Sequence, residues 1–587
     1  ESRHRYAERA AVIDQSRELT YAELDAESNQ WARLIAAHVL APGSVVAILM
    51  EKSAYQVSAA LGVLKAGCAY LPLNATHPQP RNSRIITDAG ARMILTDSHD
   101  HVSEPMMRQC VVVSALDVQD STVVAADAVR PTRAPGEQED GDRWQRSARA
   151  SVEPSPHLAG SRADEPAYII YTSGTTGRSK GAMLHHSNFI EQMHAHQLKY
   201  PFISNREVSM CFLPLNHILE KAWSYLCLSM GAQVAVLSDP KKILEALPHV
   251  RPTMMSNVPR FWEKVYIGVR DKIERSPSPI RKVMLHAIRI GERYFFDYVN
   301  EGKRPPLWLQ AMYKLYDKTL FAKVKAAVGL QRGRFFPTAG AAVSPEIARF
   351  FRSIGIPMCV GYGLSETTAT VSSMPMIGFD LNSVGVIMPA LEVKIDPTSS
   401  EILIKGSTIF SGYYNNPEAN AEAFTEDGFF RTGDAGRLEG DTLYFTERLK
   451  DLFKTANGKY IAPQMLEGML ATDALFEQTA IIADGYKFVS TLIYPNWDAL
   501  RREAAERGIP AGLTEEELAT NHEVHRLVMA HIEAALSSVA QYEKVKKFCI
   551  LTQPFSLESG ELTNTLKIRR KVVAEHYAQQ IAAMYEE

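Results

Sequence analysis

The sequence predicts an α/β protein in which a large N-terminal domain is followed by a smaller, more helical one. Its 587 residues are too many for one hydrophobic core, because a domain usually holds about 100–200 residues. Apolar strands alternate with amphipathic helices near the N-terminus, a pattern typical of parallel sheets covered by helices on both faces. After Arg448 the chain becomes more charged and helical. We therefore expect a large domain over residues 1–447 and a small domain over residues 448–587.

The first elements follow from local residue patterns. Thr20 and Glu23 have the spacing of a capping box, and an apolar helical stripe from Leu24 to Ile35 comes after them. The run Val45–Met50 is wholly apolar and predicts a buried strand. Further expected elements are a helix that reaches Leu64 and strands at residues 69–73, 91–96, 110–113 and 167–171.

Two internal stretches differ from this pattern. Residues 130–166 are rich in Pro, Gly, Ser and charged side chains, which predicts a flexible exposed loop. Residues 271–334 carry 14 Lys and Arg against 6 Asp and Glu, with aromatic residues interleaved. One interpretation is a helical insertion whose aromatic side chains form core and whose charges are solvated. The other is a basic amphipathic surface that meets anionic lipid.

Composition narrows the class of protein. Hydrophobic residues make up 46% and charged residues 22% of the chain, which excludes a mainly disordered or fibrous protein. The formal net charge of -3 gives no reason to expect a nucleic-acid partner. The six cysteines are far apart and have no zinc-site spacing, and no apolar run reaches membrane-spanning length. These features predict a reduced, cytoplasmic protein, either free or peripheral to a membrane.

A loop rich in glycine, hydroxyl groups and lysine follows the expected strand at 167–171. Glycines let backbone N–H groups approach a phosphate, hydroxyl oxygens add hydrogen bonds, and Lys180 supplies a positive charge. The spacing is not that of a Walker A motif. The residues predicted to bind a polyphosphate are Thr172, Ser173, Gly174, Thr175, Thr176, Gly177 and Lys180.

This loop resembles the phosphate-binding motif of the adenylate-forming superfamily, which includes acyl-CoA synthetases, peptide-synthetase adenylation domains and luciferases. Four further stretches resemble motifs of that family in the same order: GYGLSET at 361–367, FRTGD at 430–434, ERLKD at 447–451 and GELTNTLK at 560–567. The resemblance covers nearly the whole chain. It implies stacked mixed α/β sheets in the large domain and a small, mobile α+β domain at the C-terminus.

The resemblance also implies a role for each motif. Tyr362 offers a flat face to a purine, Glu366 and Thr172 are oxygen donors for Mg²⁺, and Asp434 accepts hydrogen bonds from ribose hydroxyls. The AGAA segment at 339–342 departs from the family's usual form, which is closer to GGAP. The remaining predicted nucleotide-binding residues are Gly340, Ala341, Ala342, Gly361, Gly363, Leu364, Ser365 and Arg448.

In the C-terminal part the resemblance implies two working orientations about a hinge at Lys450. One orientation brings Lys567 to the phosphoryl oxygens on which charge gathers. A lysine about 4 Å away could contribute about 4 kcal/mol there at an effective dielectric constant near 20. The other orientation turns Gly458 and Lys459 toward the large domain, on the CoA side. A plain β-turn is the alternative for these two residues.

The segment LPLNHILEKAW at 213–223 resembles one found in long- and medium-chain acyl-CoA synthetases. Adenylation domains for amino acids carry an Asp here that pairs with the substrate ammonium, and this segment has none. Because a buried unpaired ammonium is costly, an α-amino acid is disfavoured. His217 would orient the carboxylate or shape an acyl tunnel, with a core or capping histidine as the alternative. Residues 1–100 look closer to peptide-synthetase adenylation domains, which leaves the exact acid open.

Together these features predict an ATP- and Mg²⁺-dependent ligase that activates a hydrophobic carboxylic acid as acyl-AMP and transfers the acyl group to CoA. His217, Glu366 and Lys567 are the predicted catalytic residues. One alternative passes the acyl group to a carrier protein or a separate ligase in trans. Another is a non-catalytic nucleotide- or lipid-binding relative, against which the intact Lys180 and Asp434 argue.

Overall fold

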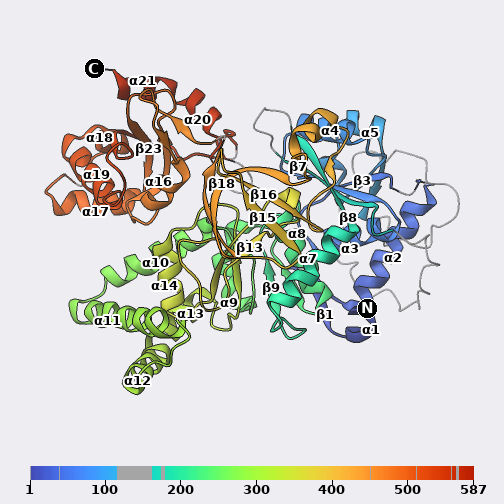
Figure 1. Ribbon diagram of the computed structural model, residues 1–587, viewed down its shortest axis with the longest axis horizontal. Helices are drawn as coiled ribbons and strands as arrows, with labels where there is room; N and C mark the ends of the chain where they lie inside the picture. The colour runs from blue at the N-terminus through green and yellow to red at the C-terminus, as the bar shows by residue number, and fades with distance from the viewer. Residues whose placement is uncertain are drawn as a thin grey trace.

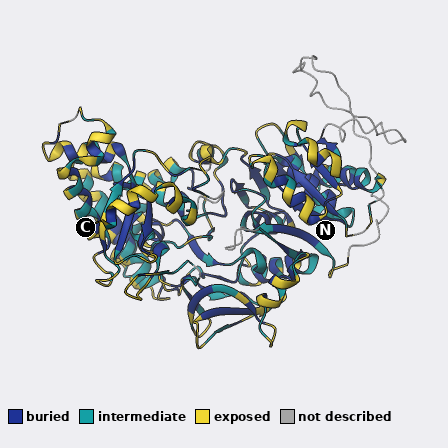
Figure 2. Cartoon of the chain, turned by 90° about the horizontal axis from the view of Figure 1, so that it is seen from above, coloured by how far each residue is buried: buried dark blue, intermediate teal, exposed yellow. Residues whose placement is uncertain are grey.

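The computed structural model describes residues 2–38, 40–41, 43–115, 162–172, 179–449, 451–510, 512–556, 558–562 and 568–586. Within these ranges, residues 2–449 form a large lobe around three sheets, and residues 451–586 form a small lobe (Figure 1). Buried strands run through the interior of both lobes (Figure 2). The loop predicted over 130–166 lies outside the described residues except for 162–166. No helix in the described part of the chain is long and apolar enough to cross a membrane.

The first sheet of the large lobe has seven strands and helices on both faces. Its elements are α2 (Tyr21–Ala37), β3 (Val45–Leu49), α3 (Ala54–Lys65), β4 (Ala69–Pro72), α4 (Gln79–Ala89), β5 (Met93–Thr96), α5 (Glu104–Gln109), β6 (Val111–Ser114), β7 (Pro166–Thr172), β8 (Lys180–His185) and β17 (Gly412–Tyr413). The strand order is β17-β8-β7-β4-β3-β5-β6, parallel from β7 to β6 and antiparallel at β8 and β17. Val46 and Ile48 pack with α2 and α3, whereas Val45, Ala47 and Leu49 pack with α4 and α5. This alternation fills the core on both faces of β3.

A second sheet of four strands and a third of eight complete the large lobe. The second has the order β2 (Glu18–Thr20), β1 (Ala10–Ile13), β10 (Gln233–Val236), β9 (Val208–Cys211), after the short α1 (Ser2–Tyr6). The third has the order β11 (Phe336–Thr338), β12 (Met358–Tyr362), β13 (Ser372–Ser373), β14 (Val386–Ile387), β19 (Thr442–Arg448), β18 (Phe430–Glu439), β16 (Glu401–Gly406), β15 (Leu391–Ile395). The helices that accompany them are α7 (His186–Lys199), α8 (Ile218–Ser229), α9 (Ile243–Val250), α14 (Pro345–Ser353) and α15 (Pro417–Ala423).

The basic, aromatic stretch forms most of a helical projection at the lower left of Figure 1. Its helices are α10 (Pro259–Glu274), α11 (Ser278–Tyr294), α12 (Leu307–Tyr316) and α13 (Ala322–Val328). Phe321 is 3% exposed and belongs to the core, and the rings of Tyr294 and Tyr313 stack 4.0 Å apart. Trp308, in contrast, is 51% exposed. The interpretation that the aromatic side chains of residues 271–334 form core therefore holds for only some of them.

The small lobe has its own core around a three-stranded sheet. Its elements are β20 (Phe453–Lys454), β21 (Tyr460–Ile461), α16 (Pro463–Leu470), β22 (Phe476–Ile482), β23 (Val489–Pro495), α17 (Trp497–Glu506), α18 (Glu515–Thr520), α19 (His522–Ala535), β24 (Val545–Ile550), α20 (Arg570–His576) and α21 (Ala578–Tyr585). Three polar contacts that involve side chains join the lobes within the described ranges. Arg502 pairs with Asp271 of α10 at 3.1 Å, the Arg260 guanidinium of α10 donates to the Glu477 carbonyl, and the Gln464 N–H donates to Glu447 Oε2 at 3.2 Å.

The local sequence predictions are largely confirmed. Thr20 and Glu23 form the reciprocal bonds of a capping box at the start of α2. The strands expected at 45–50, 69–73, 91–96, 110–113 and 167–171 correspond to β3 to β7.

Candidate active site

Asp434 is where three predicted nucleotide-binding residues meet. The antiparallel register of β18 and β19 places Asp434 opposite Arg448, whose Nε donates to Asp434 Oδ1 at 3.2 Å. The hydroxyl of Tyr362, at the end of β12, donates to Asp434 Oδ2 at 2.7 Å. The Asp434 side chain is almost fully buried.

The charges of this group are fixed by burial and by Asp434. Burial, together with the Asp434 carboxylate, raises the pKa of the Tyr362 hydroxyl well above its usual value. Burial tends to lower the pKa of Arg448, but Asp434 and nearby acidic groups outweigh it and raise that pKa. Tyr362 is therefore a hydrogen-bond donor and Arg448 a cation at any physiological pH.

Glu366 and Lys180 are linked through a tyrosine. The Tyr413 hydroxyl, from the edge strand β17, donates to Glu366 Oε1 at 3.0 Å. Lys180 Nζ lies 5.1 Å from the centroid of the same ring. Thr172 pairs with Lys180 across β7 and β8, and its hydroxyl lies 3.4 Å from the Lys180 carbonyl oxygen. The predicted metal ligands and the predicted phosphate-binding lysine thus belong to one connected group.

The donor set at Glu366 fits Mg²⁺ carried by a polyphosphate. Burial raises the pKa of Glu366 despite the opposing hydrogen bond from Tyr413 and the charge of Arg448, so a further cation would stabilise the ionised carboxylate. Within the described residues there is no group of three or more His, Cys, Asp or Glu side chains that could cage a metal. Mg²⁺ commonly takes one or two protein oxygens and completes its shell with phosphates and water. The single carboxylate of Glu366 meets that requirement.

The turn that carries Glu366 depends on a glycine. A Cβ at Gly363 would lie 1.6 Å from the Ala369 carbonyl oxygen, so no other residue fits there. Leu364 then donates its N–H to the Thr367 hydroxyl at 2.9 Å, and Ser365 begins the short 3-10 helix that contains Glu366. Gly361 pairs with Ser373 in β12 and β13.

The AGAA segment follows β11 directly. Gly340 has a φ of 98°, in the region that favours glycine. Ala341 is exposed and Ala342 is half-buried. The Ala339 N–H donates to the Asn257 carbonyl at 3.1 Å and ties the segment to the chain before α10.

His217 caps α8, which agrees with the predicted alternative of a core or capping histidine. Its Nδ1 accepts the Leu219 N–H at 3.4 Å. A role toward a substrate carboxylate is compatible with this position and stays a prediction. Trp223 is 5% exposed, and its indole N–H donates to the Ser209 hydroxyl at 2.9 Å, so this ring packs in the core.

A narrow cavity lies beside the predicted nucleotide residues. Its lining includes Ala339, Gly361 and Tyr362, together with His196 and Leu219. Its volume is about 20 Å³, enough for about one water molecule. An acyl chain would need these side chains to move apart.

The histidine that lines this cavity is neutral. Burial lowers the pKa of His196 to about 4, and its Nδ1 lies 2.8 Å from the Gln192 carbonyl. Nδ1 therefore carries the proton and donates it to that carbonyl.

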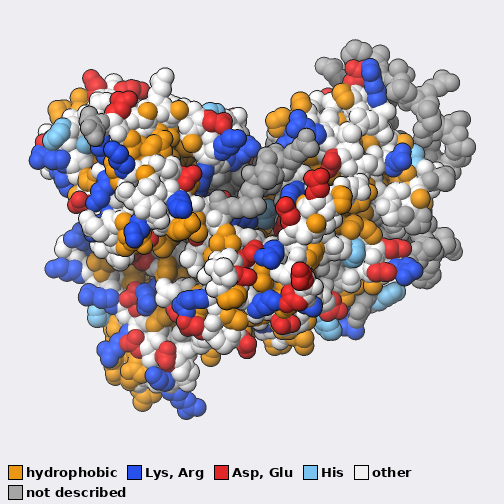
Figure 3. Space-filling view, turned by 45° about the horizontal axis from the view of Figure 1, so that its top comes forward, with side chains coloured by type: hydrophobic (Ala, Val, Ile, Leu, Met, Phe, Trp, Pro, Cys, Tyr) orange, Lys and Arg blue, Asp and Glu red, His pale blue; other side chains and the backbone are white. Residues whose placement is uncertain are grey.

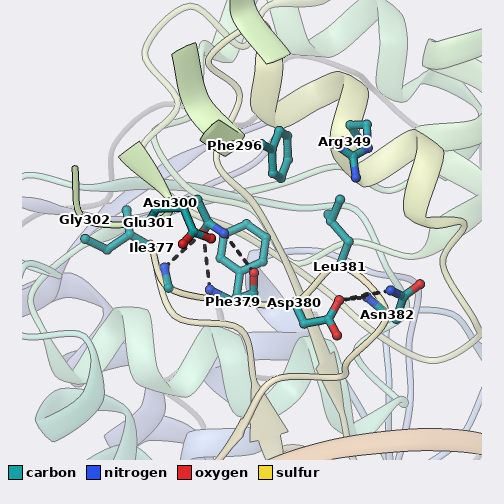
Figure 4. A pocket seen from close by; sticks show the side chains of 11 residues that line it. Phe296, Asn300, Glu301, Gly302, Arg349, Ile377, Phe379, Asp380, Leu381 and Asn382 are labelled. Atoms are coloured by element: carbon teal, nitrogen blue, oxygen red, sulfur yellow. Dashed lines mark hydrogen bonds between the residues drawn. The ribbon is translucent and has the colours of Figure 1, made fainter. Parts of the chain in front are cut away.

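A second, open pocket of about 760 Å³ lies away from the predicted residues (Figure 4). Its lining includes Phe296, Glu301, Arg349 and Asp380 and none of the predicted nucleotide-binding residues. Asn300 fixes its rim, since the side-chain amide donates to the Phe379 carbonyl at 2.9 Å.

Several predicted site residues cannot be placed. Ser173, Gly174, Thr175, Thr176, Gly177, Lys450 and Lys567 lie outside the described residues. Gly458 and Lys459 form the exposed turn between β20 and β21, where Lys459 Nζ lies 5.6 Å from the ring of Tyr542 in the same lobe. The β-turn expected as the alternative is therefore present, and a contact with CoA remains a prediction.

Two residues of the site escaped the sequence reasoning. Tyr413 connects Lys180 to Glu366, but it is distant from both in the sequence and joins them only because β17 pairs with β8. Glu447 is fully buried at the junction of the lobes, and burial raises its pKa to about 7. The position of Glu447 in the ERLKD motif is the sequence feature from which it could have been identified.

Two family models match the chain. The model described as "AMP-binding enzyme" matches residues 1–414, and the model described as "AMP-binding enzyme C-terminal domain" matches residues 450–587. Similar curated proteins include the long-chain-fatty-acid–CoA ligase FadD15 of Mycobacterium bovis. It is 34% identical over 443 residues, which are 75% of this chain and 73% of the relative. The peroxisomal long chain acyl-CoA synthetase 6 of Arabidopsis thaliana is 32% identical over 445 residues, 73% of this chain and 62% of the relative.

Solved structures share the fold at lower identity. The adenylation domain of a carboxylate reductase from Mycobacterium chelonae has a TM-score of 0.73 at 20% identity, covering 100% of this chain and 90% of that one. ATP-bound MatB from Rhodopseudomonas palustris has a TM-score of 0.68 at 21% identity, covering 97% and 96%. At these identities the likeness supports the two-part fold alone.

Proposed function

This chain belongs to the AMP-binding enzyme family, and we propose that it is an acyl-CoA synthetase that activates a hydrophobic, fatty-type carboxylic acid. Its curated relatives at 34% and 32% identity are named as a fatty-acid–CoA ligase and an acyl-CoA synthetase. The observation that carries the proposal is the junction of Asp434, Tyr362 and Arg448 beside a cavity that Tyr362 also lines. That geometry suits an acyl-adenylate, with its nucleotide at Asp434 and its acyl group directed into the cavity.

In the first step an oxygen of the substrate carboxylate attacks the α-phosphorus of ATP. The bond from that phosphorus to the bridging oxygen breaks, and pyrophosphate leaves. Lys180 and Lys567 offset the negative charge on the phosphoryl oxygens, while Asp434 orients the ribose. Mg²⁺, when bound through Glu366 and Thr172, supplies further positive charge to the polyphosphate.

In the second step the thiolate of CoA attacks the acyl carbonyl, and AMP leaves with its phosphate oxygen. We place the boundary between the two domains at residues 447 and 448 and the hinge at Lys450. The contacts Arg502–Asp271 and Gln464–Glu447 would break when the small domain turns, because each joins one lobe to the other. Gly458 and Lys459 would then line the entry of the thiol.

The proposal is tested by acid-dependent pyrophosphate release from ATP with a panel of alkanoic and aromatic acids. Acyl-AMP and acyl-CoA are followed by mass spectrometry. Parallel reactions with CoA and with a holo-acyl carrier protein identify the acyl acceptor. The carrier protein is included because a carrier acting in trans is the alternative acceptor. Absence of acid-dependent pyrophosphate with every acid would reject the proposal.

The role of Lys567 has its own variant. Lys567→Ala should slow adenylation about a thousandfold, because about 4 kcal/mol of transition-state stabilisation is lost, while ATP binding is largely kept. Lys571→Ala is the matched control, since Lys571 is an exposed residue of α20. Equal rates in the two variants would remove Lys567 from the mechanism.

We also propose that the protein contacts anionic membranes through the α11–α12 surface. We define this surface by the exposed apolar residues Ile280, Val283, Leu307, Trp308 and Leu315 and by the Lys and Arg residues among them. Residues 271–334 have a local net charge of +8, whereas the whole chain has -3. Figure 3 shows hydrophobic and basic side chains side by side at the lower left tip of the molecule. An apolar face ringed by cations is complementary to an anionic bilayer surface.

A further inference from the structure

A buried carboxylate and a lysine lie beside the segment that leads into α8. This segment, 212–217, joins β9 to α8 and ends at His217. Glu220 lies in the first turn of α8 and is fully buried. Lys52 lies in the loop between β3 and α3. β3 belongs to the seven-stranded sheet, whereas β9 belongs to the four-stranded sheet. The nucleotide site described above uses neither residue.

Both side chains bind the backbone of Leu213, and Lys52 also binds that of Phe212. Lys52 Nζ donates to the carbonyl oxygen of Phe212 and, at 3.3 Å, to that of Leu213. Glu220 Oε2 accepts the Leu213 N–H at 3.2 Å and the Ser256 hydroxyl at 3.0 Å. The start of the segment is therefore clamped by an ammonium on its carbonyls and a carboxylate on its amide.

The clamp fixes the start of the turn that leads to His217 and Leu219. After Leu213 the chain turns through Pro214, whose carbonyl accepts the His217 N–H at 3.0 Å. His217 then caps α8, and Leu219 lines the narrow cavity. A shift at Leu213 would pass directly to His217 and Leu219, because only this short turn separates them.

We propose that Lys52 and Glu220 are positioning residues for the carboxylic acid, which they serve by fixing His217 and Leu219 at the cavity. The inference rests on the proposed function. Burying a carboxylate costs several kcal/mol relative to an apolar side chain of similar volume. An apolar residue would fill the space, but it could not orient the Leu213 amide.

The electrostatics give the clamp a pH dependence. Burial raises the pKa of Glu220 to about 7, although Lys52 and the hydrogen bonds from Ser256 and Leu213 oppose this. The thiols of Cys211 and Cys227 also interact with Glu220, and burial raises the pKa of each, so both stay neutral. Burial lowers the pKa of Lys52, and Asp239 is a further acidic neighbour of that lysine. As pH falls below about 7, Glu220 is protonated and its bond to the Leu213 amide weakens.

The test compares KM for the acid with KM for ATP in four variants of the full chain. Lys52→Met and Glu220→Ala should each raise KM for the acid roughly tenfold or more, the effect of losing a charged hydrogen bond. KM for ATP should change less than about twofold, since the nucleotide residues are untouched. Glu220→Gln keeps the shape and an acceptor but lacks the charge, as the protonated carboxyl does. Its KM for the acid should therefore rise less than in Glu220→Ala, match the wild-type value below pH 7 and stay constant with pH.

Glu207→Ala is the matched control. Glu207 is 1% exposed and pairs with Arg334 next to the opposite end of β9. This variant should lose thermal stability but keep KM for the acid. If Lys52→Met and Glu220→Ala behave like this control, the inference is overturned. If Glu220→Ala does not fold, Lys52→Met and the pH profile of Glu220→Gln decide. A wild-type chain without acid-dependent turnover would instead reject the proposed function.

Discussion

The Asp434 carboxylate joins three strands of one sheet. Its two oxygens accept hydrogen bonds from Tyr362 and Arg448 on two other strands of that sheet, so the predicted ribose acceptor is also a structural junction. We expect Asp434→Asn to raise KM for ATP about 10- to 100-fold, because charge-assisted hydrogen bonds of about 1.5–3 kcal/mol are weakened. Steady-state kinetics with varied ATP measure this. Asp427→Asn, at an exposed carboxylate paired with Lys394, should leave KM for ATP unchanged; a similar rise there would refute the assignment.

We expect the buried carboxylate of Glu366 to support activity while it lowers the stability of the folded chain. Its folded-state pKa is raised above the ordinary value of 4.5, so the folded chain loses stability relative to the unfolded one as pH rises through that range. We therefore expect Glu366→Gln to keep or raise the thermal midpoint at pH 8 while it lowers kcat and the dependence on Mg²⁺. Differential scanning fluorimetry and a Mg²⁺ titration of the rate test both halves. Glu392→Gln, at an exposed position of β15, should change neither. A marked loss of stability in Glu366→Gln would contradict this account.

At the scale of elements, an ionised histidine joins three parts of the small lobe. His531 of α19 bonds Asp473 at 2.7 Å and Glu503 of α17 at 2.9 Å, and these bonds raise its pKa to about 10. Its stabilisation is fully present below the unfolded pKa of about 6.5 and is lost as pH rises through about 10. His531→Gln should therefore lower stability at pH 6.5 by about 1–2 kcal/mol, allowing for solvent screening.

The pH dependence separates this effect from lost packing. The difference in thermal midpoint between wild type and His531→Gln should shrink above pH 10. His525→Gln is the control on the same helix, since His525 bonds only the Ala519 carbonyl among the described residues. A difference that stays constant from pH 6.5 to 10.5 would show that charge plays no part.

The elements also show where local patterns suffice. The capping box at Thr20 and the wholly apolar strand Val45–Leu49 depend on neighbours in the sequence, so they could be predicted closely. Near the C-terminus, α20 and α21 are separate helices that meet at Tyr577. The periodicity of apolar residues continues across Tyr577, so the periodicity could not predict that the helix ends there. The exposure of Trp308 could not be predicted either, because the sequence does not show which face of α12 packs against another element.

At the scale of the whole molecule, the α11–α12 surface should control association with membranes. We expect Leu307→Ser combined with Trp308→Ser to weaken binding to phosphatidylglycerol-containing vesicles roughly tenfold or more, since two large apolar side chains no longer enter the bilayer. Vesicle co-sedimentation measures this, with phosphatidylcholine vesicles as the neutral arm. Leu198→Ser removes a leucine that is 67% exposed on α7, away from this surface, and should bind like wild type. Equal binding by both variants would exclude the surface.

The sequence by itself determined the family, the order of the motifs and the residue types at the predicted nucleotide site, because each motif is short and its chemistry is local. It also placed Glu366, Asp434 and Arg448 in one site by resemblance. Only the tertiary structure decided that Tyr413 bridges Lys180 to Glu366 and that Lys52 and Glu220 clamp the same backbone. Those contacts join strands and loops from different sheets, and their geometry depends on how the sheets pack against one another.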